Sequence, residues 1–517
     1  MTAAGGNSSP APPPGRELRR WVRGHTASTR SPWAILGDVY DTLLSAAILA
    51  AMTVPYLARL GTGAPASMPG MVAADPAWAA ILLALVLVGL LLDPLRRLGP
   101  LFLRTYEAAW WLPMPGDRRG LLAPVAWAEM ALAVVAGGTA GFLLAVVAGG
   151  GAATASGTIL LGGGGGALLL LALVHAQVDG TGLLGARVAL LVMAAAVLAV
   201  GALGVPFPRR AAGVVLTLLG LLADLAAAAW WWRLRVRLVD IPDSHLLEVA
   251  ARNLGAQVSW LSLDTRALGR LLSAPARRPA RPSRLPLAGL SRRLPRALGP
   301  VLAVAQADWL LLWRQPRRLV QLLAGLLIAM FPLVSSGIGA VGQAVFHLVG
   351  GWVAVLALAE PARRAWFDGA ADASWPVGPI LIRCGHLLVP ATAMTLWAAV
   401  AVPAQLREQA YSLTLTGACN IIGLVVAAGC GWAGAALRSG FRPAPDFSLG
   451  LIASPVGSLP PGAVAMLVNG PDAAALAGAP TALLAAGVSP TARLLVAQIA
   501  VSAVVVTWGL LAGRRLV

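Results

Sequence analysis

The sequence predicts an all-α, polytopic integral membrane protein with about 12 transmembrane helices in two related six-helix halves. Composition, a series of long apolar runs and an internal repeat lead to this prediction. Of the 517 residues, 58% are hydrophobic and only 12% are charged, which is far more apolar than a typical water-soluble domain. Apolar runs that cross a bilayer must be helices, because lipid offers no partners for the backbone polar groups.

The internal repeat is a short pattern of an acid, a proline and two arginines that occurs twice. It reads Asp93-Pro94-Leu95-Arg96-Arg97 in the first copy and Glu360-Pro361-Ala362-Arg363-Arg364 in the second. In each copy an apolar run ends, a polar link with Trp and Pro follows, and a new apolar run begins. The copies lie about half a chain length apart, so each predicted half carries one such loop.

The first half begins with an N-terminal tail, residues 1–32, and continues as a membrane region, residues 33–232. Within the tail, Arg16–Trp33 is either a basic helix on the inner membrane surface or a solvated tail. Six apolar runs follow, each long enough to cross a hydrocarbon core of roughly 30 Å, the shortest with its flanking residues. They lie near Leu36–Ala58, Ala77–Leu92, Leu121–Val147, Thr158–Gln177, Val188–Val205 and Ala211–Trp232.

A run of five glycines, Gly162–Gly166, lies inside the fourth of these apolar segments. A phosphate-binding loop is excluded because the chain contains no lysine, and such a loop needs a Lys-Ser/Thr pair. Close packing between helices, or a locally weak helix, explains the glycines better.

A basic cytoplasmic linker is predicted over residues 233–300, and the second half follows over residues 301–517. In the linker, Asp243 or Ser244 can cap a helix that runs to about Leu272. Val301–Trp313 is amphipathic and matches the place of Arg16–Trp33 in the first half. The second set of runs lies near Leu319–Gly339, Val341–Ala359, Leu387–Gln405, Leu413–Leu437, Leu451–Ala486 (broken by five prolines) and Thr491–Leu511.

Charge predicts both the partners and the orientation. The net charge of +18 comes from arginines that cluster in loops between apolar runs, which indicates anionic membrane lipids rather than nucleic acid. Under a twelve-span count almost all of these arginines fall on one side of the membrane. The positive-inside rule then places both termini, the linker and both repeated loops in the cytoplasm, with the chain in the plasma membrane.

The sequence offers little for catalysis. No catalytic residue, metal site or cofactor is predicted, because the five histidines are scattered and Cys384, Cys419 and Cys430 have no CxxC spacing. Acidic residues in or near spans are the candidates for intramembrane polar sites, since charge is costly in lipid. The three that we retain are Asp224, Glu129 and Asp41.

Each half resembles the membrane subunit of an ABC-2-type exporter, with an interfacial helix, six spans and a cytoplasmic loop between the second and third spans. The segment Leu112–Arg119 is similar to one that leads into the third span in that family, and Asp308, Arg314 and Pro316 resemble its entry into the first. The chain departs from the family in that its halves are fused and its second loop has only Arg383 after Trp375–Pro379. Its arginine-only composition is also similar to that of uncharacterised actinobacterial permeases.

The resemblance implies a permease whose two loops contact a separate ATP-binding cassette ATPase, which drives alternating access. The chain cannot be that ATPase, because a Walker A motif requires lysine. Two alternatives stay open at this point: a secondary transporter of the major facilitator type and a non-transporting membrane assembly protein. The residues predicted to contact the ATPase, or else to anchor the loops at the interface, are Trp110, Trp111, Arg118, Arg119, Trp375 and Arg383.

Overall fold

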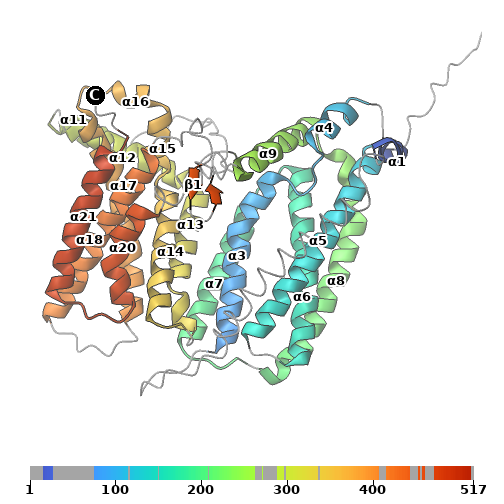
Figure 1. Ribbon diagram of the computed structural model, residues 1–517, viewed down its shortest axis with the longest axis horizontal. Coiled ribbons are helices and arrows are strands. Elements are labelled where there is room, and N and C mark those ends of the chain that lie inside the picture. The colour runs from blue at the N-terminus through green and yellow to red at the C-terminus, as the bar shows by residue number, and fades with distance from the viewer. Residues whose placement is uncertain are drawn as a thin grey trace, which may run out of the picture. The chain divides into compact units, whose positions relative to one another are not determined.

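The structure of the chain is a computed structural model, and Figure 1 shows it as a ribbon. It describes residues 15–26, 75–114, 117–148, 151–207, 209–261, 271, 288–295, 298–335, 338–406, 415–442, 452–454, 457–459 and 471–513. Apart from one short hairpin, the regular structure in these ranges is helical. The hairpin pairs β1 (Ile452–Ser454) with β2 (Gly457–Leu459) in antiparallel fashion.

Nine helices of the described part are long and apolar enough to cross a membrane. Their apolar side chains form long uninterrupted runs, and a helix satisfies all of its internal backbone groups. The chain is therefore a polytopic helical membrane protein, and the twelve-helix layout stays a prediction. The nine are α3 (Pro76–Leu98), α5 (Arg118–Val147), α6 (Ala152–Asp179), α7 (Leu184–Ala202), α8 (Arg209–Leu234), α14 (Ala340–Leu358), α17 (Pro379–Leu406), α18 (Leu415–Gly440) and α21 (Ala492–Leu511).

Three predicted spans are not among these nine. Leu36–Ala58 lies outside the described residues, and so does Asp41. In place of Leu319–Gly339 the structure has a 14-residue helix, α13 (Pro316–Ala329), followed by a tight turn, η3 (Phe331–Val334), that contains Pro332. A proline inside a helix removes a backbone donor and clashes with the preceding turn, which accounts for the early end of α13.

The proline-rich region Leu451–Ala486 does not form one continuous helix, as the sequence predicts. The hairpin of β1 and β2 lies in it, and its only described helix is the 14-residue α20 (Asp472–Ala485). The shorter helices elsewhere in the described part are α1 (Gly15–Thr26), α4 (Thr105–Trp111), η2 (Arg237–Asp240), α9 (Asp243–Leu261), α11 (Ala288–Arg293), α12 (Leu298–Trp313), α15 (Glu360–Phe367) and α16 (Gly369–Ala373). Of these, α1, α9 and α12 begin within a few residues of helices that the sequence predicts.

Contacts between residues divide the chain into two compact units. Unit 1 contains residues 1–61, 92–183 and 208–257, and unit 2 contains residues 62–91, 184–207 and 258–517. Helix α7 and most of α3 thus pack with unit 2 although they belong to the first half of the sequence. The predicted division into two six-helix halves stays a prediction.

In unit 1, the five-glycine run brings α6 against two neighbouring helices at once. A Cβ atom on Gly162 would overlap the backbone of Gly137 in α5. One on Gly164 would lie 2.9 Å from the Cβ of Ala223 in α8. Close helix packing, as the sequence predicts, is therefore the role of these glycines, and α6 is continuous through the run.

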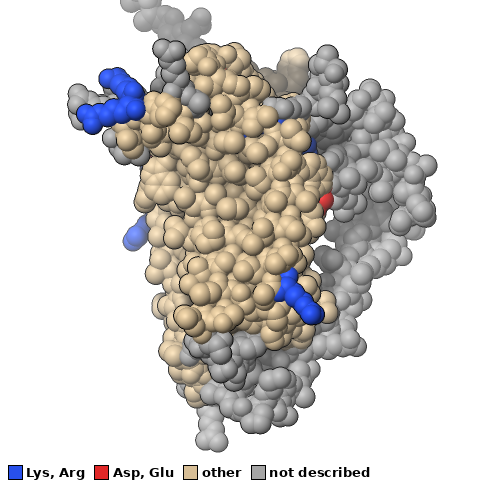
Figure 2. Space-filling view, turned by 90° about the vertical axis from the view of Figure 1, so that its left-hand side faces the viewer, with Lys and Arg blue, Asp and Glu red and all other residues tan. Residues whose placement is uncertain are grey.

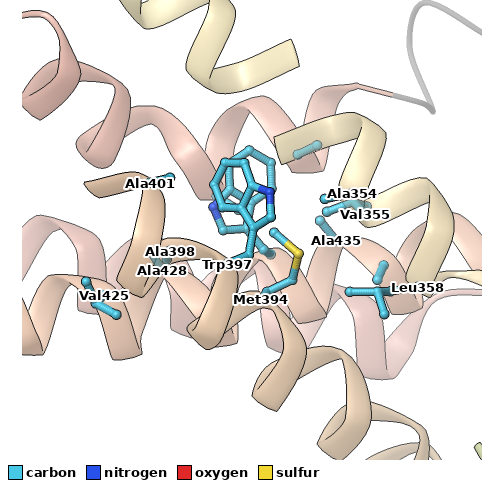
Figure 3. Packing of buried hydrophobic residues seen from close by; sticks show 14 of the residues in the cluster. Ala354, Val355, Leu358, Met394, Trp397, Ala398, Ala401, Val425, Ala428 and Ala435 are labelled. Atoms are coloured by element: carbon cyan, nitrogen blue, oxygen red, sulfur yellow. The ribbon is translucent and has the colours of Figure 1, made fainter. Parts of the chain in front are cut away.

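In unit 2, a large buried cluster is built around two tryptophans from neighbouring helices. Figure 3 shows Trp397 of α17 among Met394, Ala354 and Ala428. Its partner, Trp432 of α18, is so closely enclosed that a Cβ on either Gly351 or Gly478 would overlap its ring. Small residues around large rings give this core its close packing.

Many apolar side chains point away from both cores. On α8 the exposed face includes Leu218, Leu222 and Leu225, and on α21 it includes Val496 and Ile499. Figure 2 shows one side of the molecule on which most of the described surface carries no charge, with a few arginines near the margins. Such surfaces are expected where helices face lipid.

Candidate functional site: the two interhelical loops

The candidate site consists of two loops that repeat one sequence pattern. The first loop, residues 99–117, joins α3 to α5 and contains α4. The second loop, residues 359–378, joins α14 to α17 and contains α15 and α16. The first belongs to unit 1 and the second to unit 2.

The first loop begins where α9 caps the end of α3. The last carbonyls of a helix have no partner within it. Arg252 donates from Nη1 to the carbonyl of Arg97 at 2.6 Å, and Asn253 donates from Nδ2 to that of Leu98 at 2.8 Å. Gly99 then turns the chain at φ +70°, a backbone conformation that glycine adopts without strain.

Gln177 of α6 fixes the next part of the first loop. Its Nε2 donates to the carbonyl of Leu101 at 2.8 Å, while its Oε1 accepts from the amide of the same residue at 3.2 Å. Both residues are buried. The side-chain amide thus replaces the partners that Leu101 would have in a helix or sheet, and it ties the loop to a membrane span.

Helix α4 presents its two adjacent tryptophans to different environments. Trp111 is 7% exposed, and the guanidinium of Arg19 in α1 lies 5.0 Å from its ring centroid. Trp110 is 70% exposed. The amide of Arg104 donates to the Glu107 carboxylate at 3.0 Å, which closes the first turn of α4.

The arginines at the start of α5 complete the first loop. Asp117 caps this helix by accepting from the amides of Arg119 and Gly120 at 3.0 and 3.1 Å. Arg118 forms an ion pair with Asp243 of α9 at 2.7 Å, and Arg119 donates to the carbonyl of Val236 at 3.3 Å. Both arginines therefore hold the start of α5, just after the first loop, to the segment that follows α8.

The second loop begins with a mostly buried carboxylate that binds three arginines. Glu360 is 8% exposed and is the first residue of α15. Its oxygens lie 2.7 Å from Nη2 of Arg318 in α13, 3.1 Å from Nη1 of Arg363 and 3.1 Å from Nε of Arg364. The cluster joins the start of the loop to the start of α13.

Glu360 and Arg318 stay charged at neutral pH. Burial by itself raises the pKa of Glu360, but the guanidinium groups of Arg318, Arg363 and Arg364 outweigh it and lower that pKa below its ordinary value. Burial lowers the pKa of Arg318 to about 10, against the opposing effect of Glu360. The cluster therefore carries a net positive charge.

Further along, His386 of α17 lies between two carboxylates. Its Nδ1 is 2.6 Å from Oδ2 of Asp308 in α12, and its Nε2 is 3.4 Å from Oδ2 of Asp372 in α16. His386 and Asp308 are buried. The histidine thus connects the second loop to α12 and α17.

Arg383, one turn before His386, is directed toward the C-terminal end of α21. Its Nη1 donates to the carbonyl of Leu510 at 2.6 Å, and its guanidinium lies 4.5 Å from the ring centroid of Phe441. Trp375 follows α16 and is 37% exposed. Of the two predicted contact residues, Trp375 thus lies in the second loop and is exposed, whereas Arg383 lies in α17 and is partly buried.

The predicted intramembrane acids are not brought together by any described contact. Glu129 in α5 and Asp224 in α8 are both partly exposed, and neither makes a hydrogen bond or ion pair with the residues that the structure describes. Asp224 lies beside Gly164 of α6. Within the described ranges, no group of three His, Cys, Asp or Glu side chains could hold a metal ion.

Sequence reasoning missed two parts of this site. It found Glu360, Arg363 and Arg364 as a pattern but not their tertiary partner Arg318, and it did not connect Asp308, Asp372 and His386. The available signal was the repeat itself, because an acid that recurs before two arginines at the end of an apolar run needs a partner. The sequence did not indicate that Arg318 is this partner, because Arg318 and Glu360 are 42 residues apart in the chain.

The fold and these loops define a polytopic helical membrane protein whose spans are joined by short, firmly held helical loops. The chain belongs to DUF6297, a family of unknown function, which matches residues 71–450. No curated protein and no solved structure matches it.

Proposed function

We propose that this chain is the permease component of an ABC-type exporter, in which a separate ATPase subunit drives alternating access for an unidentified substrate. In this proposal the chain lies in the plasma membrane, and both termini and both loops are cytoplasmic. The observation that carries it is the exposed Trp110 on a loop helix whose surroundings are fixed to membrane spans.

A loop that receives force must be attached firmly to the spans that it moves. In the first loop, Gln177 of α6 holds Leu101, α9 caps the end of α3, and Asp117 caps α5. Displacement of α4 would therefore be passed to three spans of the chain rather than absorbed in the loop. Such rigid coupling is what an alternating-access mechanism requires.

The same loop also needs a surface for the partner. Tyr106, Trp110 and Met114 are all exposed around α4. Tryptophan and tyrosine are enriched among the residues that dominate binding energy in protein interfaces. We assign the docking contact to this surface, with Trp110 at its centre.

ATP hydrolysis has to come from another chain. The phosphate loop of an ATP-binding cassette contains a lysine that contacts the nucleotide phosphates. This chain contains no lysine. The partner in the proposal is accordingly a separate ATPase subunit.

The proposal can be tested with a photo-crosslinking amino acid placed at position 110 of the full-length chain in its native host. We expect an adduct with an ATP-binding cassette ATPase, and we expect ATP hydrolysis by that ATPase to be stimulated when the two are purified together in nanodiscs. Trp110→Ala should reduce the stimulation about tenfold, in line with the loss of one dominant contact.

Trp127 is the matched control, because it is exposed to a similar degree but lies within the span α5. A crosslinker at position 127 should label lipid only, and Trp127→Ala should leave ATP hydrolysis unchanged. Lipid adducts alone at position 110 would contradict the docking assignment.

A secondary transporter is the second candidate, favoured by Glu129 and Asp224, which are acids within spans. Intramembrane acids often take part in ion coupling. This candidate predicts substrate uptake or release driven by a proton or sodium gradient in proteoliposomes that contain the chain alone, whereas the ABC-type proposal predicts none.

A further inference from the structure

Helix α16 of the second loop is a single, largely exposed turn. Gly369, Ala370 and Ala373 are exposed, whereas Asp372 is only partly exposed. Its carboxylate is directed toward α17, where Oδ2 lies 3.4 Å from Nε2 of His386. This ion pair joins the exposed turn to a membrane span.

The other ring nitrogen of His386 is occupied by a second carboxylate. Its Nδ1 lies 2.6 Å from Oδ2 of Asp308 in α12, and both residues are buried. Two protons are needed to make both contacts attractive, one shared by Nδ1 and Asp308 and one on Nε2 toward Asp372. A neutral imidazole beside an ionised Asp308 has a single N–H and can satisfy only one of them.

The contact at Nε2 depends on charge more than on hydrogen-bond geometry. Nε2 of His386 is buried and makes no hydrogen bond of good geometry with the residues that the structure describes. With a proton, it presents a positive N–H to the carboxylate of Asp372. Without one, a buried lone pair faces that carboxylate, which costs free energy because neither group can be satisfied by the other.

The other groups around His386 are turned elsewhere. The ring of Phe441, at the end of α18, has its centroid 5.9 Å from that of the imidazole. Arg383, one turn earlier in α17, donates to the carbonyl of Leu510 and stacks on Phe441. Cys384 is partly buried two residues before His386. The two carboxylates are therefore the groups whose attraction the imidazole protons control.

We propose that residues 369–375 form a proton-controlled strap, which is held against α17 while Nε2 of His386 carries a proton and is released when that proton is lost at alkaline pH. The amide of Trp375 donates to the carbonyl of Asp372 at 3.4 Å, so release of Asp372 also moves this exposed tryptophan. The strap does not require the ATPase. If the proposed permease function also holds, any contact made by Trp375 becomes pH-dependent.

The test follows a spin label at position 373 of the full-length chain in nanodiscs, with the native cysteines replaced by alanine. Ala373 is exposed in α16, so the label reports the mobility of this turn without touching the ion pair. We expect the ratio of mobile to immobile label to rise about two- to fivefold between about pH 6 and about pH 10, as for the loss of a partly exposed ion pair. A ratio that does not change with pH would overturn the proposal.

Two variants separate the strap from general effects of alkaline pH. Asp372→Asn removes the charge on α16 without altering the buried core, and it should leave the label mobile at every pH. His175→Gln is the matched control, because Nε2 of His175 also pairs with a carboxylate, that of Asp179 in unit 1, at 3.0 Å. The control should keep the profile of the parent. A parental profile in Asp372→Asn, or its loss in His175→Gln, would overturn the proposal.

Nitrogen NMR of the histidine-labelled chain tests the proton itself. We expect Nε2 of His386 to be protonated near pH 7 and to lose its proton over the pH range in which the label becomes mobile. The signal is identified by its loss in His386→Gln or, if that variant does not fold, by its shift in Asp372→Asn. An Nε2 without a proton near pH 7 would overturn the proposal.

Discussion

Asp93 and Glu360 occupy equivalent positions in the same short pattern, yet the molecule uses them differently. Asp93 lies inside α3, which continues through Pro94 to Leu98, and it pairs at 2.8 Å with Arg97 four residues later. Glu360 instead begins a new helix and binds Arg318 of α13 as well as its own two arginines. One repeat thus gives a local pair in unit 1 and a tertiary cluster in unit 2.

The difference shows that a repeated pattern can specify where a helix ends without specifying what holds the following loop. In the first loop the attachment comes mainly from hydrogen bonds to backbone carbonyls, such as those of Gln177, Arg252 and Asn253, and its ion pair of Arg118 with Asp243 is half-exposed. In the second it comes from charged side chains in a mostly buried position. The two loops should therefore respond differently to the loss of a charge.

The largest expected effect follows from Glu360→Gln. Removing one partner of a buried ion pair leaves the other without compensation, and we expect a loss of about 3 to 5 kcal/mol in the free energy of unfolding. Asp93→Asn should cost less, about 1.5 to 3 kcal/mol, because it weakens a single charge-assisted hydrogen bond to Arg97 in a partly buried position. Thermal unfolding of both variants in the same detergent measures the two stability losses. Equal losses would contradict the expected difference between Glu360 and Asp93.

The double variant Glu360→Gln with Arg318→Met sharpens this comparison. Replacing both members of a buried pair is often close to neutral, so much of the lost stability should return. No recovery would mean that Glu360 acts mainly through Arg363 and Arg364.

A smaller effect is expected from acid. Because the pKa of Glu360 in the folded chain lies below its ordinary value of 4.5, its stabilising contribution is complete above pH 4.5. That contribution is lost as the pH falls from 4.5 through the lowered pKa. Unfolding midpoints measured from pH 6 downward should therefore fall less steeply in Glu360→Gln than in Asp93→Asn. If the unfolding midpoints of the two variants fell in parallel as the pH is lowered, Glu360 would not be charged in the folded chain as described.

The smallest effect is expected for the half-exposed pair of Arg118 and Asp243 in the first loop. Arg118→Glu should lower stability by about 0.2 to 1 kcal/mol, the range of exposed ion pairs. Exchanging the two charges, Arg118→Glu with Asp243→Arg, should restore stability. If Arg118 also contacts the ATPase, stimulation of ATP hydrolysis should stay low in the exchanged variant. If the stimulation returns to the parent level, Arg118 acts only through its ion pair within the chain.

Most of the spans could be predicted from sequence because their apolar runs are long and bilayer thickness sets their length. The helix predicted near Leu319–Gly339 ends earlier than predicted, at Ala329, because hydropathy does not register the effect of Pro332. The interruption of Leu451–Ala486 was predicted correctly because five prolines signal it directly.

The site was predicted less completely, and Trp110 and Trp111 show why. The two are adjacent in sequence and equivalent in composition, but α1 and the core of unit 1 cover only Trp111. Which face of a seven-residue helix is covered depends on segments far away in the chain. The same holds for Arg318 and for the link from Asp308 to His386, whose partners lie 42 and 78 residues away.

The contact between α5 and α6 has a consequence for motion. Small residues recur every four positions on both helices, with Ala133, Gly137 and Gly141 facing Gly166, Gly162 and Thr158. The side chains of Ile159 and Val134 lie against Gly138 and Gly163 of the opposite helix, so large and small residues interlock on either side of this close contact. We therefore expect α5 and α6 to move as one rigid pair, because any sliding of one helix along the other would break these close backbone contacts.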